Sequence, residues 1–419
     1  MKHLILGAGA AGISAARKIL KEKPDDEIII VSEDTEVYSR CMLHRFISGE
    51  RDAAGLNFIN DDLLERRNVT WIKGKTLTRL DADSKTVYAG DEKVASGDTI
   101  LIATGANSVT PPIGDLRTAK NAFGLRHLSD ARSIVNCAKN AEKVAIIGAG
   151  LVGLDACYAL LELGKNGLTS PQITVIEMAP SALAINVDAH AAEAYQKKFE
   201  EKGVTFLLAR KVVGTKSDGN GSITAVELDG GDSRLTSLSV PCDMVVMAVG
   251  VRPAIAFLEG SGVKTERAVV VDDYLATNVP GIYAAGDAAG LSGIWPNAQK
   301  QGEFAAYNMT GTKWAYDDRF AIKNTVNFFG LLTLSVGAIK PEEGDETLVK
   351  EDRGNYRKLI LRDGAVAGVI LQGEIGGSGF WQHLIKNKIR IDTLGKSPWK
   401  VSYADFFGVE NNGEYKWVV

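Results

Sequence analysis

Cysteine is scarce in this 419-residue chain, which contains only Cys41, Cys137, Cys157 and Cys242. No two of them form a Cys-x-x-Cys pair, and the five histidines show no metal-ligand spacing. This pattern argues against an iron–sulfur or zinc framework, so we predict no metal site. A disulfide scaffold is not expected in a chain of this size, and free cysteines usually serve as small buried apolar side chains.

Long apolar runs and a strong charge of either sign are also missing. No uninterrupted apolar segment approaches the roughly 18 residues that a membrane-spanning helix needs. The formal net charge of −4 gives no electrostatic reason to expect nucleic acid or an anionic membrane as a partner. Hydrophobic residues at 45% and charged residues at 24% are typical of a globular protein, and a length of 419 residues predicts two or three domains. Because residues 1–12 already read as a strand and a turn, we expect no removable signal and a cytoplasmic location.

Glycine is concentrated in two turns of similar design. Residues 4–12 read Leu-Ile-Leu-Gly-Ala-Gly-Ala-Ala-Gly, and residues 144–153 read Val-Ala-Ile-Ile-Gly-Ala-Gly-Leu-Val-Gly. In a dinucleotide-binding unit, the first glycine permits the tight turn and the second lets the backbone approach a pyrophosphate. The third glycine allows the helix to pack closely on the strand. The predicted phosphate-binding residues are Gly7, Gly9, Ala11 and Gly12 in the first turn and Gly148, Gly150, Leu151, Val152 and Gly153 in the second.

An acidic residue follows each turn at the end of another apolar run. Glu33 comes after residues 28–31, and Glu177 comes after residues 173–176. Such a carboxylate accepts hydrogen bonds from the ribose hydroxyls of a dinucleotide. Both spacings exceed the usual gap of about 20 residues, and loop-like residues 164–171 account for the excess in the second unit. Two turns with acidic partners predict two dinucleotides on one protein, and therefore electron transfer between them.

Strand and helix patterns alternate over most of the chain. Apolar runs near residues 99–103, 244–249 and 281–285 each end in a glycine-containing turn, and helices are predicted near residues 61–67, 187–202 and 297–309. This alternation predicts an α/β fold with parallel sheets covered by helices. After about residue 322, two apolar runs flank Asp363-Gly364, a strong hairpin signal. This end reads as a smaller α+β domain with a helix at 380–388. Phe328, Phe329 and Trp381 are expected in its core, and the alternative is that they face a partner protein.

Several further segments carry a resemblance to a known family. They are Tyr-Ser-Arg-Cys-Met-Leu at 38–43, Ala-Thr-Gly at 103–105, Gly-Val-Arg-Pro at 250–253, Tyr-Ala-Ala-Gly-Asp at 283–287 and Trp-Pro-Asn-Ala at 295–298. With the two glycine turns, they make nearly the whole chain similar to the FAD-dependent pyridine nucleotide-disulfide oxidoreductases of the glutathione-reductase-like superfamily. Within it, the chain most resembles rubredoxin reductases, ferredoxin reductases and the flavin part of nitrite reductases.

The resemblance implies a domain order that composition alone would miss. Residues 1–115 and 246–322 would form a discontinuous FAD-binding domain, residues 116–245 an NAD(H)-binding domain, and residues 323–419 a C-terminal α+β interface domain. The first turn would then bind FAD and the second NAD(H). A carboxylate at Glu177 suits a free ribose 2′-hydroxyl and repels a 2′-phosphate, and residues 178–180 supply no arginine. NAD(H) is therefore expected rather than NADP(H).

The same resemblance implies which other residues contact the cofactors. For FAD they are Arg40, Arg45, Thr104, Gly105, Arg126, Asp287 and Pro296, and for NAD(H) the further residue is Gly250. A helix that starts beside Pro296 would direct its dipole and N–H groups at the charge of the reduced flavin.

Arg45 and Asp155 match a lysine–glutamate pair beside the flavin in relatives, and both depart from those residue types. They would orient the nicotinamide, or they would be structural charges only. Arginine cannot give up a proton, so a role for Arg45 in proton delivery is not expected.

Cys41 allows two interpretations. NADH oxidases and coenzyme A disulfide reductases of the superfamily carry a redox cysteine at about this position, and a thiolate beside oxidised flavin would be reactive. Its neighbours Arg40 and Leu43 instead follow the rubredoxin-reductase pattern, in which a proline occupies this position and no thiol acts.

Three functions are compatible with these residues. The expected one is an FAD-containing NAD(H):acceptor oxidoreductase that transfers hydride at flavin N5 and exchanges electrons with a rubredoxin, a ferredoxin or an iron–sulfur subunit. Such a chain would act as an oligomer or as a subunit of a complex. The second is a stand-alone NADH oxidase, peroxidase or coenzyme A disulfide reductase that uses Cys41. The third is a flavin-binding interaction protein without turnover.

Overall fold

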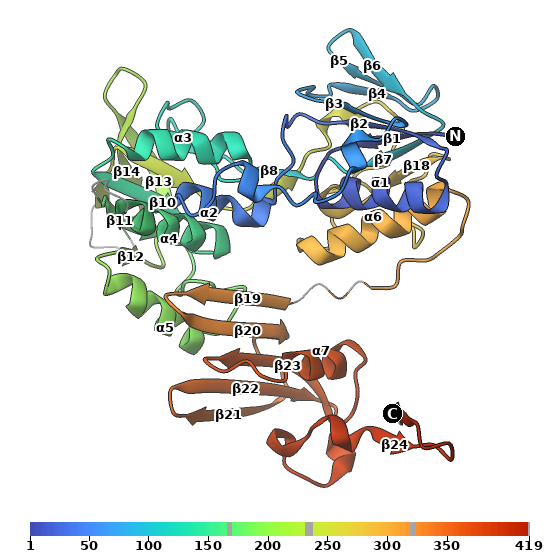
Figure 1. Cartoon of the computed structure of the whole chain (residues 1–419). Helices are drawn as coiled ribbons and strands as arrows, with labels where there is room; N and C mark the ends of the chain where they lie inside the picture. Colours follow the sequence, from blue (N-terminus) through green and yellow to red (C-terminus); the bar gives the residue numbers. More distant parts are fainter. Residues whose placement is uncertain (166–169, 231–237, 319, 321–322, 418–419) are drawn as a thin grey trace. The chain divides into compact units, whose positions relative to one another are not determined.

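The computed structural model describes residues 1–165, 170–230, 238–318, 320 and 323–417 (Figure 1). The chain forms two compact units. Unit 1 contains residues 1–142, 159–171 and 244–321, and unit 2 contains residues 143–158, 172–243 and 322–419.

Unit 1 is built on a five-stranded sheet of order β18-β7-β1-β2-β3 in which every pairing is parallel. The strands are short, rich in isoleucine and leucine, and mostly buried, as expected where both faces of a parallel sheet are covered. Their bounds are Ile282–Ala284 (β18), Thr99–Ile102 (β7), Lys2–Leu6 (β1), Glu27–Val31 (β2) and Val69–Ile72 (β3).

Two helices, α1 (Ala10–Glu22) and α6 (Trp295–Met309), lie side by side against this sheet (Figure 1). They approach closely because residue 302 is glycine: a Cβ atom on Gly302 would lie 2.1 Å from the carbonyl oxygen of Ala11. This close contact fixes where the N-termini of both helices lie relative to the ends of the strands.

Successive side chains of a strand point to opposite faces of the sheet, so the side chains of β1 contribute to two different cores. Ile5 belongs to the core that contains α1 and α6, whereas Leu4 and Leu6 belong to a second core with Val87 of β5. The second core packs against an antiparallel sheet, whose strands are Arg79–Asp81 (β4), Thr86–Ala89 (β5) and Glu92–Ser96 (β6).

Shorter elements complete unit 1. Strand β8 pairs with β17 in an antiparallel ribbon, and β9 pairs with β16 in parallel. The bounds are Leu43–Ile47 (α2), Ala106–Ser108 (β8), Ala122–Phe123 (β9), Leu128–Ala138 (α3), Met244–Met247 (β16) and Val251–Pro253 (β17).

Unit 2 begins with a strand–helix–strand arrangement like that of β1, α1 and β2. Strands β10, β11 and β12 pair in parallel, and α4, of which residues 151–158 belong to unit 2, follows β10. An antiparallel sheet of order β13-β14-β15 follows. The bounds are Lys143–Ile147 (β10), Leu151–Lys165 (α4), Gln172–Ile176 (β11), Ala189–Glu200 (α5), Thr205–Leu207 (β12), Val212–Ser217 (β13), Ile223–Leu228 (β14) and Leu238–Pro241 (β15).

The C-terminal part of unit 2 is an antiparallel sheet of order β19-β20-β23-β22-β21 with the helix α7 (Figure 1). Asp363 and Gly364 have φ values of 50° and 78°, so both adopt the left-handed conformation that a tight two-residue hairpin requires. The predicted hairpin is therefore confirmed. The bounds are Lys323–Phe328 (β19), Leu331–Gly337 (β20), Glu346–Asp352 (β21), Asn355–Arg362 (β22), Ala365–Gln372 (β23) and Ser378–Lys386 (α7).

Helix α5 joins this sheet to the first part of unit 2. The hydroxyl oxygen of Tyr195 lies within hydrogen-bond distance of the Leu331 carbonyl oxygen (2.9 Å) and of Thr333 Oγ1 (2.7 Å). Asp188, the N-cap of α5, is buried with Lys358 Nζ 2.9 Å from its carboxylate. Phe328 and Trp381 are buried and Phe329 packs on Phe199, which confirms the predicted aromatic core.

The α/β class with two Rossmann-like regions and a C-terminal α+β domain is confirmed, and the helices predicted near 187, 297 and 380 form. The helix predicted at residues 61–67 is wrong, because only a 3-10 turn, Leu63–Glu65, forms there. Asp61 accepts a hydrogen bond from the backbone of Leu63 and pairs with Arg17, and local bonds of this kind compete with a helix. In the predicted loop at 164–171, α4 continues to Lys165, and residues 166–169 lie outside the described residues.

Candidate functional site

The first glycine turn lies between β1 and α1 and has no room for side chains at two positions. Gly7 has φ +116°, and a Cβ atom there would lie 2.2 Å from the carbonyl oxygen of Ala103. A Cβ atom on Gly12 would lie 1.9 Å from the carbonyl oxygen of Gly7. Gly9, the N-cap of α1, has no atom within 4 Å of its Cβ position. The turn is therefore close-packed against backbone atoms at Gly7 and Gly12 and open at Gly9, where the N–H groups at the start of the helix can face an anion.

The second glycine turn, between β10 and α4, repeats this geometry. Gly148 has φ +105°, close to the value at Gly7. Its N–H donates to the Ile176 carbonyl oxygen at 2.8 Å, as that of Gly7 donates to Val31 at 2.7 Å. The Cβ position of Gly150 is open, like that of Gly9. Leu151, Val152 and Gly153 form the first turn of α4. Both turns thus provide the open backbone and helix N-terminus that a dinucleotide pyrophosphate needs.

The acidic residues after β2 and β11 differ in their surroundings. Glu33 is exposed. Glu177 is half-buried, and its carboxylate accepts hydrogen bonds from the backbone N–H groups of Ala149 and Ala179, both at 2.8 Å. Glu177 therefore braces the glycine turn that precedes it by almost thirty positions. The sequence pattern placed Glu177 beside a ligand but did not indicate this contact with the protein's own backbone.

Unit 1 brings together two residues for which contact with the same cofactor was predicted. The guanidinium of Arg126 forms an ion pair with Asp287, and its Nε donates to the carbonyl oxygen of Ala106 at 3.0 Å. The backbone N–H of Arg126 donates to Asp130 Oδ2 at 2.8 Å. Arg126 thus makes three contacts. It lies just before His127, the N-cap of α3, and its guanidinium pairs with the 3-10 turn Gly286–Ala288, which contains Asp287.

A second ion pair in unit 1 involves Arg40. Its Nη2 lies 2.6 Å from Asp34 Oδ2, and its Nη1 donates to the carbonyl oxygen of Arg126 at 2.9 Å. Burial alone would raise the pKa of Asp34, but hydrogen bonding to His127 and the charge of Arg40 outweigh it and lower that pKa to about 2. Tyr38 donates its hydroxyl to Asp34 at 2.7 Å. Sequence reasoning assigned no role to Asp34 or to His127, although His127 directly follows Arg126.

Residues 103–105 lie against the first glycine turn. Ala103 provides the backbone that Gly7 approaches, and Thr104 Oγ1 donates to the carbonyl oxygen of Ala254 at 2.8 Å. Gly105 has φ +72°. Gly250 belongs to unit 1, and its carbonyl oxygen accepts a hydrogen bond from the N–H of Val109 at 3.0 Å.

Helix α6 starts at Trp295, and Pro296 occupies its first turn. Proline is tolerated there because the N–H groups of the first turn have no partner within the helix. Asn297 is buried and donates to the carbonyl oxygen of Phe320 at 3.1 Å. Gln301, also buried, accepts a hydrogen bond from the N–H of Gly286 at 2.8 Å. This bond ties α6 to the turn that contains Asp287. The sequence did not single out Gln301, although a glutamine on the apolar face of a predicted helix is a usable signal.

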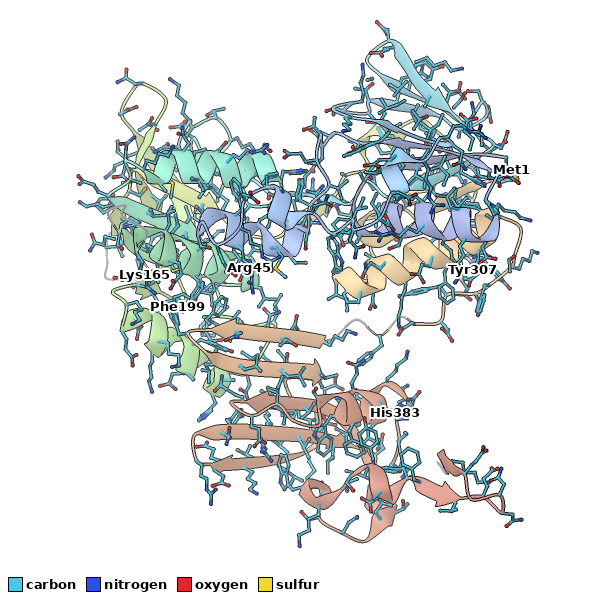
Figure 2. The ribbon with its side chains drawn as sticks, viewed as in Figure 1. Met1, Arg45, Lys165, Phe199, Tyr307 and His383 are labelled. Carbon is cyan, nitrogen blue, oxygen red and sulfur yellow. The ribbon has the colours of Figure 1, made fainter. Side chains whose placement is uncertain are left out.

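Of the three residues predicted to take part in chemistry, two lie in unit 1 and one lies in unit 2. Arg45, labelled in Figure 2, is on α2 in unit 1 and forms an ion pair with Glu50. Cys41 is exposed in the 3-10 turn before α2. Asp155 is on α4 in unit 2, and burial raises its pKa to about 7. Burial, followed by the charge of Arg45, lowers the pKa of His44.

Among the residues that the structure describes, no group of three or more His, Cys, Asp and Glu side chains is placed to hold a metal ion. In the same part of the chain, no helix combines the length and the apolar character needed to cross a bilayer.

Two family models match the chain. Residues 1–302 match the pyridine nucleotide-disulphide oxidoreductase family, and residues 323–389 match the rubredoxin NAD+ reductase C-terminal domain. A ferredoxin reductase structure from Rhodopseudomonas palustris superposes with a TM-score of 0.80 at 20% identity, covering 93% of this chain and 95% of that one. This likeness shows the fold.

Two curated relatives illustrate the range of similar proteins. The assimilatory nitrate reductase electron transfer subunit of Bacillus subtilis (strain 168) is 29% identical over 379 residues, which are 88% of this chain and 47% of the relative. The chain thus spans about half the length of the curated relatives matched first. Subunit epsilon of the NADH-dependent phenylglyoxylate dehydrogenase of Aromatoleum evansii is 27% identical over 94% of this chain and 93% of its own length. The two matching glycine turns and the match over residues 1–302 lead to one conclusion: the chain belongs to the pyridine nucleotide-disulphide oxidoreductase family.

Proposed function

We propose that the chain is an FAD-containing NAD(H):acceptor oxidoreductase that passes electrons between NAD(H) and a one-electron protein partner. The single observation that carries this proposal is the duplicated turn: Gly7 has a positive φ and Gly9 is open in unit 1, and Gly148 has a similar φ and Gly150 is open in unit 2. Two open helix N-termini of this kind suit two dinucleotides.

The first turn is assigned to FAD because the other residues expected to bind FAD lie in the same unit. They are Ala11, Gly12, Glu33, Arg40, Arg45, Thr104, Gly105, Arg126, Asp287 and Pro296. The ion pairs of Arg126 with Asp287 and of Arg40 with Asp34 hold these side chains in fixed positions before a ligand arrives. Pre-organisation of this kind lowers the entropy lost on binding.

The second turn is assigned to NAD(H). Glu177 supports NAD(H) over NADP(H), because a carboxylate already oriented toward the turn by two N–H groups would repel a 2′-phosphate. Gly250 completes the proposed NAD(H) contacts. Residues 1–115 and 246–322 are proposed as the FAD-binding domain, residues 116–245 as the NAD(H)-binding domain and residues 323–419 as the interface domain.

FAD, when bound, takes up a hydride as an electron pair and releases electrons singly. The protein's own groups have positioning tasks. The N-terminus of α6, held by Asn297 and Gln301, would stabilise negative charge by its dipole. Arg45 and Asp155 are proposed to orient the nicotinamide. The ion pair of Arg45 with Glu50 supports the alternative that Arg45 is structural.

The partner is proposed to be a redox protein or an iron–sulfur subunit. Support comes from the match of residues 323–389 to the rubredoxin reductase C-terminal domain and from relatives named as an electron transfer subunit and as subunit epsilon. A cytoplasmic location remains part of the proposal.

Anaerobic titration tests the function. The purified chain, reconstituted with FAD, should lose its visible flavin absorption on addition of one equivalent of NADH, and a one-electron acceptor should restore it. A chain that takes up no FAD, or bound flavin that NADH leaves oxidised, would overturn the proposal.

A second function is favoured by the exposure of Cys41 beside Arg40 in unit 1. In it, the chain reduces oxygen, peroxide or a disulfide through this thiol. Cys41→Ser separates the two functions. Unchanged NADH-dependent reduction of a one-electron acceptor supports the first function, and loss of turnover with retained flavin and NADH binding supports the second.

A further inference from the structure

The chain continues beyond the part that the C-terminal family model matches. That match ends at residue 389, and residues 390–417 form three 3-10 turns and a two-stranded hairpin. The hairpin strands are Phe407–Val409 (β24) and Tyr415–Trp417 (β25), which pair antiparallel. This segment has no part in the proposed cofactor sites.

The segment is anchored to the C-terminal sheet and to α7. The N–H of Ile391 donates to the carbonyl oxygen of Gly364 at 2.8 Å, at the tip of the β22–β23 hairpin. The ring of Phe380 on α7 lies 4.9 Å from that of Tyr403 and 5.9 Å from that of Phe406. Because Phe406 is fully buried, the turn that precedes β24 is held in place by packing.

Next to this anchor, large apolar side chains face solvent. Tyr403 is 47% exposed, Phe407 is 43% exposed and Val409 is 65% exposed. Phe407 and Val409 are two residues apart on one strand and therefore lie on the same face. The rings of Tyr403 and Phe407 have centroids 6.5 Å apart. Three exposed large apolar residues within seven positions form a patch rather than isolated exposed side chains.

A basic stretch leads to this apolar patch. Residues 386–400 contain five basic residues and one acidic residue, Asp392, in a chain whose overall charge is −4. All five basic side chains are exposed, and the ion pairs in this stretch include those of Arg390 with Asp392 and of Lys396 with Asp405. The five are Lys386, Lys388, Arg390, Lys396 and Lys400. The local positive charge would repel a cationic partner and attract an anionic one.

We propose that residues 386–409 form a docking surface for an acidic protein, with Tyr403, Phe407 and Val409 as its apolar centre and the five basic residues as its rim. An apolar centre with aromatic anchors and a charged rim is the usual composition of a protein interface. The charge of the rim selects the sign of the partner and speeds association. This inference rests on the proposed function, because the partner is taken to be the one-electron carrier or the subunit that holds it.

Two double variants test the surface. K388E/K400E reverses two rim charges, and F407S/V409S removes two apolar side chains. Their matched controls are K340E/K350E and V349S, which change exposed residues outside this segment in the same unit. The probes are a purified acidic rubredoxin, basic cytochrome c and ferricyanide, each reduced with NADH by the FAD-loaded full chain.

The rim variant should raise the KM for rubredoxin about tenfold at low salt, and the difference should shrink as salt screens the charges. The KM for cytochrome c should fall or stay the same. F407S/V409S should raise the KM for rubredoxin at all salt concentrations. Both controls should leave it unchanged.

Ferricyanide separates this proposal from the proposed function, because it needs no protein docking. If the parent chain did not reduce ferricyanide with NADH, the proposed function would be contradicted. Intact ferricyanide reduction with an unchanged KM for rubredoxin in both double variants would overturn the docking surface alone. The docking surface would also be overturned if the parent chain neither bound nor reduced rubredoxin, if F407S/V409S dissociated a homodimer, or if K388E/K400E abolished binding to anionic vesicles instead.

Discussion

The two glycine turns have nearly the same backbone and are braced by different means. In unit 2, Glu177 binds the backbone of its own turn through Ala149. In unit 1, the corresponding Glu33 is exposed, and the turn is instead backed by the main chain of Ala103. A shared motif therefore fixes the local turn geometry, while the residues that support it come from whichever segments the fold places nearby.

The two units also differ in the electrostatics of their carboxylates. Asp34 in unit 1 is paired with Arg40, and its pKa is lowered to about 2. Asp155 in unit 2 is half-buried, and burial raises its pKa to about 7. At neutral pH the first is a fixed charge and the second titrates. Asp34 thus stays charged across the physiological pH range, whereas the charge of Asp155 changes near neutral pH.

The largest effect is expected from Gly12→Ala. Its Cβ atom would lie 1.9 Å from the carbonyl oxygen of Gly7, so the helix must move away from the strand. We expect a loss of about 3 kcal/mol in the free energy of unfolding, measured by urea denaturation of the flavin-free protein. Gly9→Ala is the matched control, because its Cβ position is open. Equal stability of the two variants would show that the turn is not close-packed.

Gly9→Ala and Gly150→Ala compare the ligands of the two turns directly. Both should keep the fold, and each methyl group should obstruct one pyrophosphate, weakening binding about tenfold, or about 1.4 kcal/mol. Gly9→Ala should lower the FAD content per chain. Gly150→Ala should retain FAD and raise the KM for NADH. The opposite result, with flavin lost from Gly150→Ala, would reverse the proposed assignment of the two turns.

Glu177→Gln and Glu33→Gln test whether the two acidic residues differ in structural role. A glutamine at 177 has one acceptor oxygen for two N–H donors, so we expect a loss of about 1 to 2 kcal/mol in the free energy of unfolding. Glu33→Gln should change it by less than about 0.5 kcal/mol, since the side chain is exposed. Chemical denaturation without cofactors measures both, and similar values would contradict the bracing role of Glu177.

Asp155→Asn should give the smallest and most pH-dependent effect. The folded pKa of about 7 lies above the reference value of 3.8, so between these values the folded state binds a proton that the unfolded state has lost. Stability therefore falls as pH rises through this window. Because asparagine carries no charge, the stability of the variant relative to the parent protein should rise between pH 3.8 and about pH 7 and stay constant above that. The expected gain is on the order of 1 kcal/mol, reduced by the partial exposure of the side chain.

Thermal denaturation at several pH values measures the Asp155→Asn effect. Asp34 provides the contrast of opposite sign. Its lowered pKa contributes stability that is present above the reference value of 3.8 and is lost as pH falls toward 2. A constant difference between Asp155→Asn and the parent protein at all pH values would rule out titration of Asp155 near neutrality.

Features that depend on neighbouring residues could be predicted well. The two turns, the hairpin at Asp363-Gly364 and the helix near residue 297 follow from local backbone preferences and from apolar periodicity. The helix predicted at 61–67 failed because the Asp61 side chain accepts a hydrogen bond from the backbone N–H of Leu63, a local bond that competes with a helix. The contact between Arg126 and Asp287 joins residues 161 positions apart, and the resemblance named both residues without indicating that they form a pair.

The sequence alone determined where the chain turns around a phosphate, because glycine is the residue that permits a positive φ and a close backbone approach. It also determined the strand and helix order, since apolar spacing selects the face that each element buries. Only the tertiary structure decided that Glu177 braces its own turn, that Arg126 meets Asp287 and that Asp155 titrates near neutral pH. These properties depend on burial and on long-range contacts, which exist only after the segments have packed together.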